Sequence, residues 1–97
     1  MHVISKTALI TFWEIHADAE DPLKAWYDHV KRVSWQSPTD VQRDYGDAVI
    51  LPDNRAVFHI RGNHYRLVVR MNYATRSIYI RFVGTHAEYD RIDARKI

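Results

Sequence analysis

Three consecutive segments of the chain alternate between apolar and polar residues, and only short turns separate them. Residues 55–60, 64–71 and 78–83 have this period of two, which is typical of strands that bury one face. The turns between them are Gly62-Asn63 and the sequence NYATRS. Because short turns join neighbouring strands, the segments predict an antiparallel meander. Its apolar face is expected to carry Ala56, Phe58, Ile60, Tyr65, Leu67, Val69, Met71, Ile78, Ile80 and Phe82.

The opposite face of the predicted meander is basic. No acidic residue occurs between Asn63 and Thr85, whereas arginine recurs through the second and third strands. Like charges on neighbouring strands repel each other, so this face is expected to meet a negatively charged partner. A nucleic-acid backbone would supply that charge, and Tyr65, Tyr79 or Tyr89 could stack on bases. The residues expected on this solvent-facing side are His59, Arg61, Arg66, Arg70, Tyr79 and Arg81.

Net charge differs between the two halves of the chain. Residues 1–53 contain 5 Lys and Arg and 9 Asp and Glu, a net charge of −4, whereas residues 54–97 contain 9 and 3, a net charge of +6. The asymmetry suggests that the C-terminal half binds a polyanion or an acidic partner. Two alternatives remain open: the halves attract each other, or acidic N-terminal residues or the last helix cover the basic face.

The residues before the meander have helical spacing. A short strand is expected at residues 2–4, and Ser5 is expected to cap a helix that starts at Lys6. Asp21 is expected to cap a second helix, with Pro22 at its first position. The apolar stripes of the two helices are Leu9, Phe12, Trp13 and His16, and Leu23, Trp26, Tyr27, Val30 and Val33. Helices joined by so few residues predict an antiparallel helical hairpin.

A short last helix is expected after the meander. Gly84 ends the third strand, and the sequence THAE that follows is a capping box. In this motif the Thr85 hydroxyl accepts a hydrogen bond from the Glu88 N–H, and the Glu88 carboxylate accepts one from the Thr85 N–H. The helix therefore starts at His86, and residues 90–97 are polar enough to be loosely attached.

Together these elements predict one α+β domain over residues 1–97. An N-terminal strand and a two-helix hairpin pack on an antiparallel sheet of three to four strands, and a short C-terminal helix follows. A helical turn after Pro38 and a strand at residues 48–51 complete the expected fold.

The composition excludes several kinds of site, because the residues or motifs that these sites require are missing. Cysteine is absent, which excludes disulfides and thiolate metal sites. No histidine pair has the spacing of a metal site, and neither a phosphate loop nor a serine-nucleophile motif occurs, so we expect no metal and no cofactor. The apolar runs are too short to cross a membrane and the first residues lack signal-peptide features, so we expect a cytoplasmic protein.

An ordered set of short motifs runs from Val57 to Asp90. It consists of Phe58, Gly62-Asn63, Tyr65-Arg66-Leu67, Tyr79-Ile80-Arg81, Val83 and Thr85-His86-Ala87-Glu88-Tyr89-Asp90. This set resembles the HigB family of RelE-like toxins from type II toxin–antitoxin systems. The opening sequence MHVIS, followed by a helix, is also similar. No single motif is specific, but their order is.

The resemblance implies a RelE-like fold and an mRNA interferase. Such a toxin is an endoribonuclease that cleaves messenger RNA, usually on the translating ribosome, and so inhibits translation and growth. The resemblance also implies a HigA-type antitoxin that neutralises the toxin. The expected partners are therefore the antitoxin, mRNA and the ribosome, with operator DNA contacted only through the antitoxin.

Metal-free RNA cleavage uses the 2′-hydroxyl of the RNA as nucleophile. His86 is the expected proton carrier, because histidine side chains exchange protons near neutral pH. Arg66 and Arg81 are expected to hold the reacting phosphate, and Tyr89 to stack on a base or donate a proton. Which group is the base and which the acid stays open. The expected RNA-binding residues are His59, Arg61, Asn63, Arg70 and Tyr79.

Simpler interpretations of these residues remain. His86 could be an ordinary surface histidine, and Tyr89 could pack the last helix. Arg66 and Arg81 could form ion pairs, and Asn63 fits a turn better than a ligand site. The chain could also be a non-catalytic RNA- or ribosome-binding module that uses the same basic face, or a regulatory subunit that receives an acidic antitoxin segment there.

Overall fold

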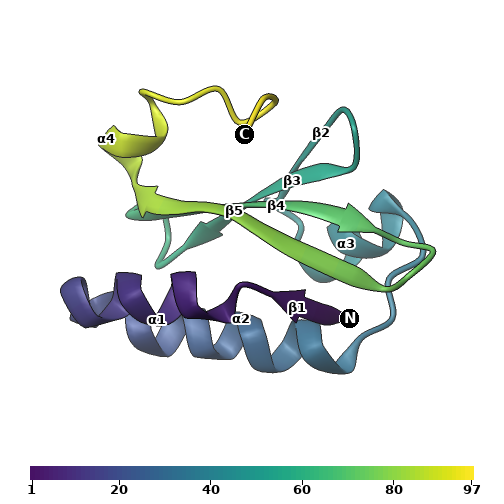
Figure 1. Ribbon diagram of the computed structural model, residues 1–97, viewed down its shortest axis with the longest axis horizontal. Helices are drawn as coiled ribbons and strands as arrows, with labels where there is room; N and C mark the ends of the chain where they lie inside the picture. Colours follow the sequence, from purple (N-terminus) through teal and green to yellow (C-terminus); the bar gives the residue numbers. More distant parts are fainter.

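The computed structural model describes all 97 residues and has a helical layer on one face of a five-stranded sheet (Figure 1). The strand order is β1-β5-β4-β3-β2. The elements are β1 (His2–Ile4), α1 (Lys6–Ile15), η1 (Ala17–Ala19), α2 (Glu20–Arg32), α3 (Pro38–Asp44), β2 (Val49–Leu51), β3 (Arg55–Ile60), β4 (Tyr65–Asn72), β5 (Ser77–Thr85) and α4 (His86–Tyr89). In Figure 1, α1 and α2 lie under one face of the sheet, whereas α4 and the C-terminal residues lie over the other.

The predicted meander is confirmed. Strands β3, β4 and β5 pair antiparallel in chain order, and β2 extends the sheet beside β3. The α+β class is confirmed too, but the sheet is mixed and has five strands rather than an antiparallel three or four. Strand β1 pairs parallel with β5, from His2 opposite Ser77 to Ile4 opposite Tyr79. Its partner lies far away in the sequence, so no local pattern could identify this pairing.

The helices and the sheet bury a core centred on Phe58 of β3, which is 1% exposed. Its ring centroid lies 5.4 Å from that of Trp26 in α2 and 5.1 Å from that of Tyr45 after α3. The ring of Trp35, just before α3, stacks at 6.2 Å. Aromatic pairs at such distances add to the stabilisation that burial alone gives. This cluster fixes the helical layer to the sheet, and the opposite sheet face remains for other contacts.

A β-bulge in β5 changes the face of one predicted core residue. Val68 of β4 pairs with Phe82. The next residue, Val69, pairs with Ile80, which leaves Arg81 as the extra residue of the bulge. Phe82 therefore packs on the same face as Val68, away from the helices, and its predicted place in the main core is wrong.

Residues 90–97 pack on the sheet, so the expectation of a loosely attached segment is wrong. Ala94 is 7% exposed and packs with Val68, which is 0% exposed. Nε of Arg55 donates a hydrogen bond to the main-chain oxygen of Ile97 at 3.0 Å. The other main members of this second apolar cluster are Val57 and Ile92. A few apolar residues in a polar segment are enough to attach it, because the strands present valines at matching positions.

Two of the predicted helix caps are wrong. Helix α1 begins at Lys6 as predicted, but Ser5 has a φ of 76° and its side chain makes no capping hydrogen bond. Helix α2 begins at Glu20, because η1 leads directly into it, so Asp21 lies in the first turn rather than at the cap. Helix α4 begins at His86 with the predicted capping box. None of the helices combines the length and the apolar character that a membrane crossing requires.

Candidate functional site

The predicted row of basic residues is not continuous: two separate hollows are present, and Arg70 and Arg81 line only one of them, whereas two histidines line the other. Each hollow has a volume of about 420 Å³. The His86 hollow is lined by Asn63, His64, Thr85, His86 and Ala87. The Arg81 hollow is lined by Asn54, Arg70, Met71, Asn72, Tyr79 and Arg81. Residues 90–97 pack on Val68, which lies between Arg66 and Arg70 in β4, so this C-terminal segment separates the two hollows.

His86 stands at the start of α4 with its side chain 53% exposed, and its Nδ1 lies 3.0 Å from Oδ2 of Asp90. The capping box holds this turn: the Thr85 N–H donates to Oε1 of Glu88 at 2.8 Å, and the Glu88 N–H donates to Oγ1 of Thr85 at 3.2 Å. The bond from the Thr85 N–H is the main reason why the pKa of Glu88 lies below its ordinary value. With Nδ1 facing Asp90, Nε2 of His86 is the ring nitrogen left for a ligand.

A second imidazole, that of His64, lines the same hollow. The main-chain N–H of His86 donates to the carbonyl of His64 at 3.1 Å, which holds α4 against the β3–β4 turn. Nη1 of Arg61 lies 3.1 Å from Nδ1 of His64. Because arginine only donates, Nδ1 of His64 accepts this bond and the ring proton sits on Nε2. The hollow therefore brings together two imidazoles whose free nitrogens differ in hydrogen-bonding character.

The β3–β4 turn is tied to the helical layer through Asp18 of η1. Nη1 of Arg61 lies 3.3 Å from Oδ2 of Asp18, and the Tyr65 hydroxyl donates a hydrogen bond to Oδ1 of the same carboxylate. This bond from Tyr65 is the main cause that lowers the pKa of Asp18, and it also raises the pKa of Tyr65. Tyr65 is only 7% exposed, so its predicted availability for base stacking is wrong.

Arg66 is buried, at 6% exposed, so its predicted place among solvent-facing arginines is wrong. Its Nη1 donates to the main-chain oxygens of Asn63 at 3.0 Å and Tyr65 at 3.3 Å, and its Nη2 donates to Oδ1 of Asn63 at 3.4 Å. The ring of Tyr89 covers the guanidinium, with its centroid 5.8 Å away. The strand does point Arg66 outward, but α4 covers it. Arg66 and Asn63 thus form the structural support of the turn beside the His86 hollow.

His59 lies outside both hollows. It is the pairing partner of Arg66 across β3 and β4. Its side chain is 18% exposed and its Nδ1 lies 3.6 Å from Oδ2 of Asp47. The Nδ1 atom is buried without a hydrogen-bond partner. A role for His59 in RNA binding stays a prediction.

The Arg81 hollow has an excess of positive charge. Nη2 of Arg70 lies 3.0 Å from Oδ1 of Asp53, whose other oxygen lies 2.8 Å from Nη1 of Arg55. The hydrogen bond from Arg55 is the main cause that lowers the pKa of Asp53. Arg81 is exposed and forms no ion pair, and Tyr79, opposite Arg70 in the sheet, is 38% exposed. Arg81 and His86 line different hollows. Their shared role at one phosphate stays a prediction.

A family model described as HigB_toxin, RelE-like toxic component of a toxin-antitoxin system, matches residues 19–92. The chain belongs to the HigB toxin family. This match confirms the resemblance, and membership in a toxin–antitoxin system implies an antitoxin partner. A comparison with curated proteins found no match. The matched residues of this HigB-family toxin include both hollows, whereas β1 and α1 precede them.

Sequence reasoning assigned no role to three residues that shape the site of this HigB-family toxin: His64, Asp90 and Asp18. A signal for Asp90 was present, since residues four apart in a helix lie on the same side, and Asp90 is four residues after His86. The contacts of His64 and Asp18 join the β3–β4 turn to α4 and to η1, so no local pattern could reveal them. The structure contains no group of three or more His, Asp or Glu residues placed to hold a metal ion.

Proposed function

We propose that this HigB-family toxin is a metal-independent endoribonuclease that cleaves mRNA on the translating ribosome in the cytoplasm. The observation that carries the proposal is the His86 hollow. There, an imidazole oriented by a carboxylate lies beside a second imidazole on a turn that a buried arginine supports. Cleavage by the 2′-hydroxyl requires a base near the attacking 2′-oxygen and an acid near the departing 5′-oxygen, and imidazoles can serve in both roles.

The reaction uses the RNA's own 2′-hydroxyl. Its proton leaves to a base as the 2′-oxygen attacks the phosphorus. The bond from phosphorus to the 5′-oxygen then breaks, and that oxygen receives a proton from an acid. The products are a 2′,3′-cyclic phosphate and a 5′-hydroxyl end. His86 is the proposed proton carrier through Nε2, since Asp90 takes up Nδ1.

The neighbouring residues have supporting roles in this proposal. Asp90 is a positioning residue that fixes the ring of His86. Tyr89 packs on Arg66, and its half-buried ring is proposed to stack on a base or donate a proton. Arg66 holds the turn, because its donors already bind Asn63 and Tyr65. Arg61 is exposed at the same edge and is proposed to contact the RNA, although its charge is partly compensated by Asp18.

The antitoxin is proposed to be of the HigA type. It would neutralise the toxin by binding it directly, and the toxin would contact operator DNA only through the antitoxin. An adjacent reading frame that encodes a small helix-turn-helix protein would support this pairing.

The test compares wild type with His86→Gln, and with His2→Gln as a matched control on the distant strand β1. Single-turnover cleavage of mRNA is measured on programmed ribosomes, together with ribosome binding. Glutamine keeps a neutral hydrogen-bonding side chain, so binding should persist. Cleavage should fall by roughly 10²–10⁴-fold, the usual contribution of one general acid–base group. Asp90→Asn should give a smaller loss, and His2→Gln none.

Intact mRNA after induction of the wild-type protein, with 5′ ends mapped across the transcriptome, would contradict the proposal. Ribosome binding without cleavage would instead favour the non-catalytic binding module. If His86→Gln cleaves within a few-fold of wild type, another group carries the proton, and Tyr89 is the next candidate.

A further inference from the structure

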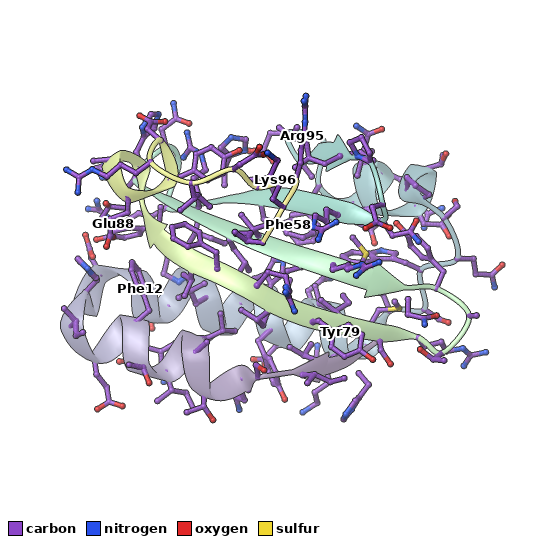
Figure 2. The ribbon with its side chains drawn as sticks, turned by 45° about the horizontal axis from the view of Figure 1, so that its top comes forward. Phe12, Phe58, Tyr79, Glu88, Arg95 and Lys96 are labelled. Carbon is purple, nitrogen blue, oxygen red and sulfur yellow. The ribbon has the colours of Figure 1, made fainter.

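We propose that the Arg81 hollow is a second, non-catalytic subsite that binds single-stranded RNA at least about four nucleotides away from the scissile bond, at roughly 3.4 Å per stacked nucleotide. The inference rests on the proposed function for the identity of the ligand. It assigns a role to a hollow that lies apart from the histidines. In Figure 2, Tyr79 marks the end of β5 that is farther from Glu88 and α4.

The charges of the hollow are not neutralised within the protein. Asp53 is the one carboxylate that pairs with Arg70, and it is shared with Arg55. Arg81 has no ion pair, and the bulge at this residue places it with Arg70 and Tyr79 in the same hollow. Two guanidinium groups around one hollow repel each other unless an anion lies between them. A phosphate group would accept hydrogen bonds from both.

The other lining residues favour a nucleotide over an acidic peptide. Tyr79 leaves 38% of its surface exposed between the arginines, and an exposed aromatic ring of this kind is a platform for stacking a base. Asn54 and Asn72 add amide groups, which pair with base edges. Oδ1 of Asn72 accepts a bond from the Thr75 N–H, so its amide N–H₂ remains a donor. An acidic peptide would use the arginines but would need neither the ring nor the amides.

The spacing between the hollows sets the length of RNA that can occupy both. Arg66 beside the His86 hollow and Arg70 in the Arg81 hollow are four residues apart in β4, a span of about 13 Å at roughly 3.3 Å per residue. A stacked strand needs at least about four nucleotides for that span, at roughly 3.4 Å each, because it must also pass over residues 90–97.

The segment between the hollows does not oppose such a path. Residues 90–97 carry Arg95 and Lys96, whose side chains project from this segment in Figure 2. Arg95 is exposed and forms no ion pair, whereas Lys96, whose side chain is 82% exposed, lies 3.9 Å from Asp93. Residues 90–97 carry three Lys and Arg and two Asp, so a strand that runs from one hollow to the other would meet a small excess of positive charge.

The test uses 2′-O-methyl oligonucleotides, which cannot be cleaved through the 2′-oxygen, so binding is measured without reaction. Fluorescence anisotropy of labelled oligonucleotides of two to twelve nucleotides gives the affinity of wild type, Arg81→Ala, Tyr79→Ala and the control Arg32→Ala. Arg32 is an exposed arginine at the end of α2, on the helical face, and its substitution removes the same charge far from both hollows. Circular dichroism confirms that each variant is folded.

Wild-type affinity should rise once the oligonucleotide is long enough to reach both hollows. Arg81→Ala should weaken binding of the decamer roughly tenfold, as expected for loss of a charged hydrogen bond. The slope of log affinity against log salt should fall by about 0.7, the value for one phosphate contact with a single strand. Tyr79→Ala should weaken the decamer about 5- to 100-fold through lost stacking. Neither change should alter dinucleotide binding.

Equal decamer affinities for Arg81→Ala and Arg32→Ala would overturn the inference, as would absence of decamer binding by wild type. If Arg81→Ala leaves RNA binding intact but weakens binding of a decaglutamate peptide, the hollow receives protein and the RNA assignment is wrong. The binding measurements test the Arg81 hollow independently of whether the protein cleaves mRNA. A wild-type protein that binds the decamer through Arg81 but leaves mRNA intact on ribosomes would refute only the catalytic proposal.

Discussion

Replacing Arg66 with alanine should destabilise the fold, because the structure buries this arginine under Tyr89. Its guanidinium is held by three acceptor oxygens, the carbonyls of Asn63 and Tyr65 and the amide oxygen of Asn63. The sequence alone predicts an exposed side chain whose removal leaves stability unchanged. The two expectations differ enough to be separated by a single unfolding measurement.

The size of the effect follows from what each partner can do after the substitution. A hydrogen bond to a charged group contributes about 1.5–3 kcal/mol. Both acceptors on Asn63 lie in an exposed turn, where water can replace the arginine. The carbonyl of Tyr65 is buried, so its bond is the costly one to lose. Loss of the contact with Tyr89 adds about 0.5–1 kcal/mol. We expect the free energy of unfolding to fall by about 2–3 kcal/mol, with roughly 4–8 °C in Tm for each kcal/mol.

Urea unfolding followed by tryptophan fluorescence measures this change, since Trp26 and Trp35 are 2% and 1% exposed and report on the core. Arg81→Ala is the matched control, because it removes an exposed arginine without an ion pair and should change stability by less than about 0.5 kcal/mol. If both variants unfold at the same urea concentration with the same slope, the hydrogen bonds of Arg66 do not stabilise the fold and the reasoning is refuted. Loss of cleavage in Arg66→Ala bears on catalysis only under conditions where the variant is folded.

Two further substitutions test other parts of the structure. A Cβ at Gly84 would lie 2.4 Å from Cζ of Phe82, so Gly84→Ala should lower the free energy of unfolding by about 1–3 kcal/mol as the ring is displaced; an unchanged urea midpoint would show that Phe82 moves freely. A hydrogen bond from Trp35 holds the pKa of Asp44 below its ordinary value of 3.8, with a smaller contribution from His29. The carboxylate therefore stabilises the fold above pH 3.8, and this stabilisation disappears as pH falls through the lowered pKa. Asp44→Asn does not titrate, so it should lose less stability than wild type between pH 5 and pH 2; equal acid sensitivity in thermal unfolding would contradict this assignment.

Local patterns in the sequence were sufficient for the elements that carry the site. The period of two between Arg55 and Phe82 predicted β3, β4 and β5, because alternation follows directly from the pleat of a strand. The capping box predicted the start of α4 at His86, because it involves only residues three apart. The order of the motifs between Val57 and Asp90 predicted the HigB family, which the family match confirms.

The same patterns failed wherever a distant segment covers a residue. Alternation shows which way Arg66 points, but not that Tyr89 will lie over it. It also cannot locate a bulge, and the bulge at Arg81 reversed the face of Phe82. Residues 90–97 were predicted to be loosely attached, but they cover Val68. Their few apolar side chains can be buried only against the folded strands.

Sequence by itself therefore determined the secondary structure of the meander, the family and the outward direction of the arginines, because each depends on residues close together in the chain. Tertiary structure decided that β1 joins the sheet beside β5 and that the C-terminal segment divides the basic face into two hollows. It also decided that His64 comes to lie beside His86, whose contact with Asp90 is local. These features depend on contacts between segments far apart in the sequence, and such contacts are stabilised only when the folded chain buries apolar surface between those segments.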